Sequence, residues 1–305
     1  MIAIGFDTSN YTTSCASFSG SEAHNVSRLL PVKPGELGLR QADALFSHIK
    51  RLPELSDSLF ASIQADQIGA IGVSTRPRAV EGSYMPCFLA GECQARVLAS
   101  ALHVPLHTFS HQQGHIASVL YSADRMDLLG KRFLAWHLSG GTTELLLVDS
   151  AGGEILCQKI GGTTDISAGQ LIDRTGLMLG LDFPAGKALD ALAAEDDGKD
   201  VFHVKVHDLE FSFSGVENQV RSYYEKTGAP AATARFALRS VIGAVRRATL
   251  DAQKSHPYPV VFSGGVASNR LLRQSMQDLD CVFAEPVYST DNALGIAVLT
   301  YLREA

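Results

Sequence analysis

The sequence predicts an α/β protein built from two duplicated lobes. The first observation is a repeated strand–turn–strand unit, because Ile2 to Phe18 and Phe133 to Val148 each place a hydroxyl-rich turn between two apolar runs. The two units start about 130 residues apart. The second observation is that short apolar runs alternate with helical patterns along the chain, which is typical of layered α/β folds.

In the first lobe, short apolar runs bounded by turn residues predict strands near 2–7, 14–18 and 69–74. Patterns with apolar residues three and four apart predict helices near 36–50, 54–66, 88–102 and 112–121. The second strand–turn–strand unit starts just after Lys131, so we expect a first lobe at 1–130 and a second at 131–290. The C-terminal segment 291–305 is expected to pack on the first lobe.

The same criteria applied to the second lobe predict strands near 133–138, 144–149, 155–160, 259–262 and 281–284. Helices are expected in this lobe near 167–180, 186–194, 215–226, 231–254 and 268–278, and in the C-terminal segment near 291–303. No low-complexity linker separates these segments.

Two turns carry the glycines and hydroxyls that suit a phosphate. Ser139-Gly140-Gly141 lies between two strands, and Ser263-Gly264-Gly265 joins a strand to a helix that starts near Asn269. Glycine lets backbone approach a ligand, and consecutive N–H groups or a helix N-terminus attract an anion. A single such turn could equally be an ordinary glycine hairpin. Its repetition favours a nucleotide held in the cleft between the lobes, in a plan that resembles the actin-like ATPase fold of actin, sugar kinases and Hsp70.

Composition limits the class of protein. The 305 residues are 46% hydrophobic and 19% charged, with a net charge of −6, so we expect a soluble globular enzyme and not a general polyanion binder. No apolar run is long enough to span a bilayer, and the N-terminus lacks the basic flank and cleavage site of a secretion signal. The five cysteines have no Cys-x-x-Cys spacing and are expected to be reduced. These features predict a cytoplasmic protein that does not contact a membrane.

An arginine-rich helical stretch leaves a local basic surface open. Arg235, Arg239, Arg246 and Arg247 lie on it, and Arg221, Arg270 and Arg273 are near in sequence. Such a helix is more often a solvated surface than a nucleic-acid contact, so we expect the former and keep the latter as the alternative.

Two histidines form a candidate metal site. His111 and His115 are four residues apart, so they share a face if the segment is helical. Two imidazoles at this spacing suit a divalent cation, although the pair alone is a weak signal. Asp291 is the best candidate for a third ligand, and its alternative role is the N-cap of the last helix.

The order of motifs resembles the TsaD-type family of tRNA threonylcarbamoyladenosine synthases, historically described as O-sialoglycoprotein endopeptidases. The similarity runs from Ile2 to about Leu302. It covers Gly5-Phe6-Asp7-Thr8-Ser9, the pair His111 and His115, Ser139-Gly140-Gly141, Ala168-Gly169-Gln170-Leu171-Ile172-Asp173, Leu179-Gly180-Leu181-Asp182-Phe183-Pro184, Phe211-Ser212-Phe213-Ser214-Gly215, Gly264-Gly265-Val266-Ala267-Ser268-Asn269 and Ser289-Thr290-Asp291-Asn292-Ala293.

The resemblance implies a two-lobed actin-like ATPase (ASKHA) fold and a transfer of a threonylcarbamoyl group from an acyl-adenylate to an adenosine of tRNA. It implies one divalent metal, with iron or zinc expected first, held by His111, His115 and Asp291. ATP or an acyl-adenylate would be the second cofactor. The residues implied to surround the adenylate are Ser139, Gly140, Gly141, Asp173, Gly186, Asp190 and Asn269, and the glycine turn adds Gly264 and Gly265.

The chain departs from the family pattern on the acceptor side. Tyr11 and Thr12 stand where the family has two carboxylates, and Thr142 stands where it has a histidine. The family's Gly-Pro-Gly loop is replaced by Thr75-Arg76-Pro77-Arg78, followed by a longer segment from Glu81 to Gly91. We therefore interpret the chain as a divergent paralogue.

The candidate catalytic residues follow from these matches and departures. They are Asp7, Ser9, Thr12 and Glu81. Asp7 keeps the acidic position at the end of the first strand. Arg76 and Arg78 could bind an anionic acceptor, or Glu81 could replace the lost acid function.

Three functional interpretations follow from these residues. The first is a threonylcarbamoyl or carbamoyl transferase acting on tRNA adenosine or another amine or hydroxyl. The second is a non-catalytic nucleotide-binding paralogue that regulates or scaffolds a true synthase, as a homodimer or a heterodimer. The third, a peptidase, is rejected because His111 and His115 lack the glutamate of His-Glu-x-x-His. Retained metal ligands favour the first reading over the second.

Overall fold

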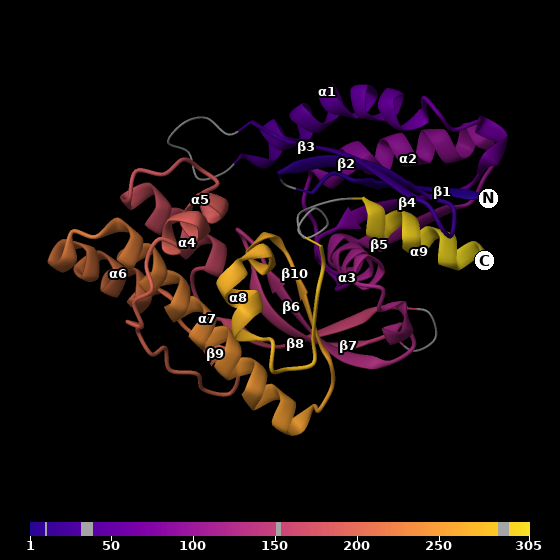
Figure 1. Cartoon of the computed structure of the whole chain (residues 1–305). Coiled ribbons are helices and arrows are strands. Elements are labelled where there is room, and N and C mark those ends of the chain that lie inside the picture. The colour runs from indigo at the N-terminus through magenta and orange to yellow at the C-terminus, as the bar shows by residue number, and fades with distance from the viewer. Residues whose placement is uncertain (10, 32–38, 151–153, 286–292) are drawn as a thin grey trace. The chain divides into compact units, whose positions relative to one another are not determined.

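The computed structural model describes residues 1–9, 11–31, 39–150, 154–285 and 293–305. These residues form two compact units (Figure 1). The first unit comprises Met1–Asp127 and Thr290–Ala305, and the second comprises Leu128–Ser289. No helix within the described ranges is long and apolar enough to cross a membrane.

The first unit is built on a five-stranded sheet in the order β3-β2-β1-β4-β5. Its strands are β1 (Ile2–Asp7), β2 (Thr12–Phe18), β3 (Ala23–Leu29), β4 (Ile68–Arg76) and β5 (Leu106–Ser110). β1, β2 and β3 form an antiparallel meander, whereas β4 and β5 run parallel to β1. The helices are α1 (Gln41–Phe60), α2 (Phe88–Leu102), α3 (His111–Ser122) and α9 (Leu294–Glu304), with 3-10 turns η1 (Ala65–Gln67) and η2 (Met126–Leu128) nearby.

Helices cover both faces of this sheet. Ile4 and Phe6 of β1 point into a core with residues of α1 and α2. The alternate residue Gly5 faces α9, where an added Cβ would lie only 2.6 Å from the Ala297 nitrogen. Because successive strand residues face opposite sides, α9 lies across the sheet from α1 and α2. The segment 291–303 was expected to be helical, and the helix begins at Leu294.

The second unit repeats the plan of the first. Its sheet has the order β11-β10-β6-β7-β8-β9. β6 (Arg132–Leu138), β7 (Thr143–Asp149) and β8 (Leu156–Thr163) form an antiparallel meander, and β10 (Val260–Ser263) and β11 (Cys281–Phe283) add in parallel on the far side of β6. The short β9 (Glu210–Phe211) adds at the other edge. The shared meander with two parallel strands confirms the predicted duplicated α/β fold.

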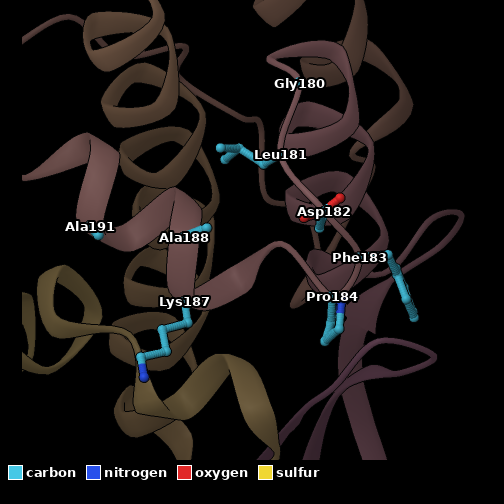
Figure 2. Close-up of a pocket in the computed structure, with 8 residues that line it drawn as sticks. All are labelled: Gly180, Leu181, Asp182, Phe183, Pro184, Lys187, Ala188 and Ala191. Carbon is cyan, nitrogen blue, oxygen red and sulfur yellow. The ribbon is translucent and has the colours of Figure 1, made fainter. Parts of the chain in front are cut away.

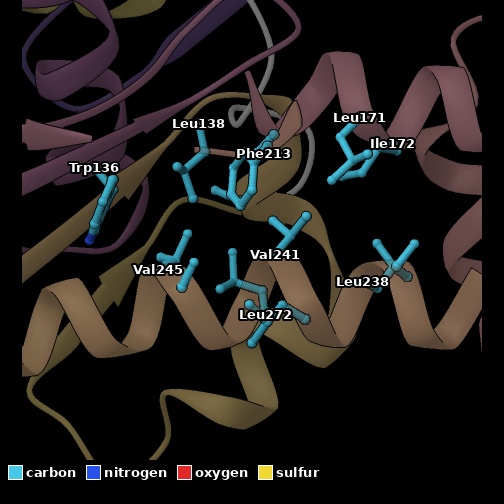
Figure 3. Packing of buried hydrophobic residues seen from close by; sticks show 14 of the residues in the cluster. Trp136, Leu138, Leu171, Ile172, Phe213, Leu238, Val241, Val245 and Leu272 are labelled. Atoms are coloured by element: carbon cyan, nitrogen blue, oxygen red, sulfur yellow. The ribbon is translucent and has the colours of Figure 1, made fainter. Parts of the chain in front are cut away.

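Helices complete this unit around a large apolar core. They are α4 (Ala168–Met178), α5 (Gly186–Ala193), α6 (Ser214–Thr227), α7 (Pro230–Ser255) and α8 (Arg270–Ser275), with the 3-10 turn η4 (Gly265–Ser268) before α8. Figure 3 shows Val241 and Val245 of α7 beside Leu138, Phe213 and Leu272. Trp136 is fully buried in the same cluster, and its indole N–H donates to the Thr249 hydroxyl of α7 at 2.9 Å.

Several predicted elements were wrong in detail. The two helices expected at 36–50 and 54–66 are one helix, α1, which passes through Pro53; residues 36–38 lie outside the described residues. Strands β3, β5 and β9 were not predicted. Each lies at a sheet edge, where polar residues replace the continuous apolar run of a central strand. The helix expected at 268–278 is shorter, because Gly265–Ser268 forms a 3-10 turn and α8 starts only at Arg270.

Candidate functional site

In the first unit, the carboxyl ends of three parallel strands bring polar side chains together. β1 ends at Asp7, β4 ends at Arg76 just after Ser74, and β5 ends at Ser110, directly before His111. Ligands in open α/β sheets bind outside the carboxyl ends of the strands. This edge of the sheet is therefore a candidate functional site.

Asp7 lies at the centre of this group. Its side chain is only 1% exposed. Oδ1 accepts a hydrogen bond from the Ser74 hydroxyl, and Oδ2 accepts from the Ser9 hydroxyl at 3.2 Å. Oδ2 also lies 2.9 Å from Nδ1 of His111. A buried carboxylate needs such partners, so the three contacts explain how Asp7 is tolerated inside the fold.

His111 is the first residue of α3 and His115 lies one turn later, so the two share a face of the helix, as their spacing predicted. The Nε2 atoms of His111 and His115 are 2.8 Å apart, and the two rings meet at 72°. The short contact of His111 Nδ1 with a carboxylate identifies this nitrogen as the protonated one. In the neutral imidazole this leaves the lone pair on Nε2, the nitrogen that faces His115.

This arrangement fits a divalent metal. With metal–nitrogen bonds of about 2.0–2.1 Å, two neighbouring imidazole ligands have nitrogens about 2.9–3.4 Å apart, so small ring movements would admit an ion. A carboxylate on the other ring nitrogen is the usual partner of a metal-binding histidine. The third predicted ligand, Asp291, lies outside the described residues. Among those that are described, no group of three His, Cys, Asp or Glu side chains could hold a metal.

The predicted catalytic residues separate into two groups. Asp7 and Ser9 are in contact. Thr12 is buried at the start of β2, and within the described parts of the chain its side chain makes no hydrogen bond to Asp7 or to the histidines. Glu81 is exposed in a turn and is likewise not bonded to them among the residues placed here. Ser74 was missed, although a hydroxyl directly after the apolar run of a strand was a signal that could have found it.

In the second unit, the Ser139-Gly140-Gly141 turn links β6 to β7 and packs on α4. The Ser139 hydroxyl accepts hydrogen bonds from the backbone N–H groups of Gly141 at 3.3 Å and Thr142 at 3.0 Å. These two N–H groups are therefore already engaged in a local turn. A Cβ added at Gly140 or Gly141 would meet nothing within 4 Å, so the outer side of the turn is open.

Two aspartates connect the other predicted adenylate residues. Asp173 of α4 accepts from the Ala185 N–H at 2.9 Å, directly before Gly186. Burial raises the pKa of Asp173, and this hydrogen bond opposes the shift only in part. Asp190 of α5 accepts from the Asn269 amide at 2.9 Å and from Arg270 at 2.8 Å.

The Gly264-Gly265 turn is fixed by its backbone. Gly264 has φ +90°, and an added Cβ would lie 2.3 Å from the Leu138 carbonyl oxygen, so only glycine fits. At Gly265 a Cβ would meet nothing within 4 Å. Asn269 is the N-cap of α8, because its side chain accepts from the Leu272 N–H at 3.0 Å.

An open groove of about 520 Å³ lies beside α5 (Figure 2). The turn before α5 and the first turns of that helix line it, through Gly180, Leu181, Asp182, Phe183, Pro184, Lys187, Ala188 and Ala191. In Figure 2, Lys187 extends away from Leu181 and Asp182. Gly186 and Asp190 are not among the lining residues, so the groove and the predicted adenylate residues are neighbours on α5 without coinciding.

The arginine-rich surface is largely paired. Arg246 forms an ion pair with Asp278, and Arg247 forms one with Asp251 at 2.9 Å. Arg235 donates to the carbonyl oxygens of Gly198 and Ala193. Arginines held by carboxylates and carbonyls are less available to phosphates, which favours the structural interpretation of this surface.

Four of the five cysteines are poor candidates for a catalytic nucleophile. Burial raises the pKa of the Cys15, Cys87, Cys157 and Cys281 thiols to about 12, so none of these four is a thiolate near neutral pH. Cys93 is exposed.

Comparison with solved structures reports on the fold. The chain superposes on "full-length HypF in the phosphate- and nucleotide-bound form" with a TM-score of 0.65 at 15% identity, over 99% of this chain and 47% of that chain. The chain thus spans about half the length of that protein. A ROK hexokinase from Thermus thermophilus matches with a TM-score of 0.54 at 15% identity, over 100% and 99% of the two chains. At these identities the likeness shows the actin-like ATPase fold alone.

Sequence comparison identifies the family. The family profile described as "tRNA N6-adenosine threonylcarbamoyltransferase" matches residues 39–298. Proteins of that description from Chlorobium phaeobacteroides and Ralstonia pickettii are 33% and 30% identical to this chain. The first match covers 80% of this chain and 75% of the relative, and the second covers 99% and 91%. The chain therefore belongs to the TsaD-type family of tRNA N6-adenosine threonylcarbamoyltransferases.

Proposed function

We propose that this protein transfers a threonylcarbamoyl or carbamoyl group from an acyl-adenylate to an amine or hydroxyl, with an adenosine of tRNA as the first acceptor to test. Family membership supports carbamoyl transfer as the chemistry. The observation that carries the proposal is the contact chain from Asp7 through His111 to His115 at the strand ends.

The reaction is an acyl transfer. The acceptor nitrogen or oxygen forms a bond to the carbamoyl carbon, and the bond from that carbon to the phosphate oxygen breaks. AMP leaves with the electron pair, and the acceptor loses one proton to water. Positioning the two reactants and stabilising negative charge on the phosphate and the carbonyl oxygen supply most of the acceleration in such a reaction.

His111, His115 and Asp291 would hold a divalent metal, with iron or zinc expected first. When bound, the ion supplies positive charge beside the phosphate and the carbonyl oxygen. Asp7 is a positioning residue in this proposal: by accepting from His111 Nδ1–H it orients the ring and leaves Nε2 as the nitrogen that would bind the ion. Ser74 and Ser9 in turn orient the Asp7 carboxylate.

The second unit would bind the adenylate. Gly140, Gly141 and Gly265 leave open space beside their backbone. The Asp190–Asn269 hydrogen bond links α5 to the N-terminus of α8 and would fix one side of an adenosine pocket. Asp173, which supports Gly186 through Ala185, would fix another.

A second function has its own support. Tyr11, Thr12 and Thr142 replace family residues, and Glu81 is exposed and, among the described residues, makes no hydrogen bond to Asp7 or His111. A protein that kept nucleotide and metal binding but lost transfer would regulate or scaffold an active synthase, as a homodimer or with another family member. The two functions make opposite predictions for a transfer assay.

The test is a reconstituted transfer reaction with the full chain loaded with metal, threonylcarbamoyl-adenylate and unmodified tRNA. Modified adenosine is measured by nucleoside mass spectrometry against a reaction without protein. Product above that background, lost in His111→Ala/His115→Ala, supports the transferase. No product while AMP still binds rejects transfer to tRNA and supports the regulatory paralogue.

A further inference from the structure

Arg76 ends strand β4 at the edge that carries the Asp7–His111–His115 contacts. The β4–β5 register places it beside Ser110, and the next residue along the chain is His111. The pairing is irregular between Ser74 and Arg76, which marks a β-bulge. Bulges commonly redirect a side chain next to an active site.

The loop after Arg76 is attached to the start of α3. The Gln112 N–H donates to the Pro77 carbonyl oxygen at 3.1 Å, and the Gln113 N–H donates to the Ser110 hydroxyl at 3.2 Å. Protein atoms therefore use these N–H groups of the helix N-terminus. The helix dipole still adds positive potential here, but an anion at this end of α3 needs another donor.

Arg76 has donors to spare. Its side chain is partly buried, and within the described residues its single hydrogen bond goes from Nη1 to the hydroxyl of its neighbour Thr75, at 3.2 Å. By contrast, Arg28, Arg96 and Arg125 of the same unit each lie on a carboxylate. A guanidinium has five N–H donors in a planar fork that matches a carboxylate or a phosphate, so most of the Arg76 donors stay available to such a group.

Among the described residues, Asp7, the carboxylate of this site, makes no hydrogen bond or ion pair with Arg76. Asp7 has its oxygens on Ser74, Ser9 and His111. We infer that Arg76 binds an oxyanion of the acyl donor beside the histidine pair and thereby determines which donor the protein accepts. This inference rests on the proposed function, since the donor is the acyl-adenylate of that reaction.

Two groups of such a donor have the required chemistry: the carboxylate of the carbamoylated amino acid and the phosphate of the adenylate. Both accept two parallel N–H···O bonds from a guanidinium. N-carbamoyl-L-threonine carries the first group without the second, and AMP carries the second without the first. Ligand-observed NMR titration of each probe separates the two sources.

The variants are Arg76→Ala and Arg76→Lys, with Arg96→Ala as the matched control, because Arg96 is an arginine of the same unit paired with Glu92. We expect Arg76→Ala to weaken one of the two probes by about 10- to 100-fold, as for loss of a charge-assisted pair. Arg76→Lys keeps the charge without the fork and should retain part of the affinity. Arg96→Ala should bind like the unchanged protein. Circular dichroism confirms folding, and the lysine variant carries the test if the alanine variant unfolds.

The outcomes separate this inference from the proposed function. Selective loss of N-carbamoyl-L-threonine supports a carboxylate partner, and selective loss of AMP supports a phosphate partner. If the unchanged protein binds a probe and both Arg76 variants bind it equally well, Arg76 is not the anchor, while the proposed function stands. If the unchanged protein binds neither probe and forms no product, the proposed function fails and this inference fails with it.

Discussion

At the residue scale, the site of the first unit depends on contacts that no spacing reveals. The four-residue interval of His111 and His115 could be read from the sequence, because a helix places such residues on one face. The Ser74–Asp7 contact joins residues 67 positions apart and depends on the β1–β4 register. Pair register is set by the fold as a whole, so the sequence could mark Ser74 as a candidate but could not predict its contact with Asp7.

The histidine pair gives the first prediction. His111→Ala/His115→Ala should abolish metal retention, because two of the three expected ligands are lost, while the fold remains. Elemental analysis of the purified protein measures this, and His24→Ala is the control, since His24 is exposed on β3. Unchanged metal content in the double variant would show that the ligands lie elsewhere.

Asp7 gives a related prediction about affinity. Asp7→Ala should weaken metal binding by about 10- to 100-fold, as for other carboxylates that orient a metal-binding histidine. Asp7→Asn should lose less, because its amide oxygen can still accept from His111. Competition with a chelator measures both constants. Equal metal affinity in the three proteins would contradict the positioning role.

At the element scale, the adjacent glycines Gly264 and Gly265 should differ in how well they tolerate a side chain. Gly264→Ala should destabilise the fold by at least about 1–3 kcal/mol, because it combines a left-handed φ with a clash against the Leu138 carbonyl. Gly265→Ala is the matched control and should stay within about 0.5 kcal/mol, since its Cβ position is open. Urea unfolding compares them. Equal losses in the two variants would mean that the turn geometry is not what requires glycine.

Asn269 caps α8 and, in the proposed function, also belongs to the adenosine pocket. Asn269→Ala should cost about 1 kcal/mol through loss of the α8 cap, and it should also weaken AMP binding. Asn269→Ser keeps a capping oxygen and removes only the bond to Asp190. If calorimetry shows weaker AMP binding in both variants but destabilisation in alanine alone, the pocket role is separate from the cap. An unaltered dissociation constant in both would count against the adenosine pocket.

Two aspartates of the second unit should respond to pH in opposite directions. Burial acts to raise the pKa of Asp165, but hydrogen bonds from Ser212, Phe213 and Ser214 outweigh it and hold that pKa below its usual range. Asp165 thus stabilises the fold above the unfolded pKa of about 3.9, and the gain is lost as pH falls. The pKa of Asp173 is raised, so ionisation of Asp173 costs stability as pH rises.

Urea unfolding from pH 3 to 7 tests this pair. The deficit of Asp165→Asn relative to the unchanged protein should shrink toward acid pH. Asp173→Asn keeps an acceptor for Ala185 and does not ionise, so it should gain stability relative to the unchanged protein as pH rises. Parallel profiles for the two variants would contradict the opposite pKa shifts.

At the scale of the whole molecule, the duplicated architecture was the most predictable feature. The two strand–turn–strand units each carry a hydroxyl-rich turn between buried strands. This repeat can be recognised in the single sequence, without an alignment to other proteins. Edge strands such as β3 were missed because their exposed residues show no apolar run. Asn269 was placed in the right turn but not as a helix cap, since Gly265–Ser268 forms a 3-10 turn that glycine content does not reveal.

In the proposed function each unit binds its own ligand. Each ligand should therefore stabilise mainly the unit that binds it. The single tryptophan of the chain, Trp136, is buried in β6 of the second unit, so its fluorescence reports the unfolding of that unit. AMP at about 100 times its dissociation constant should stabilise its unit by about 2.7 kcal/mol, raising the fluorescence transition by several degrees. Metal bound at His111 and His115 should instead raise the part of the circular dichroism transition that tryptophan does not follow. If both ligands shift both signals equally, the units unfold as one cooperative block, and the assignment of each ligand to its own unit loses this support.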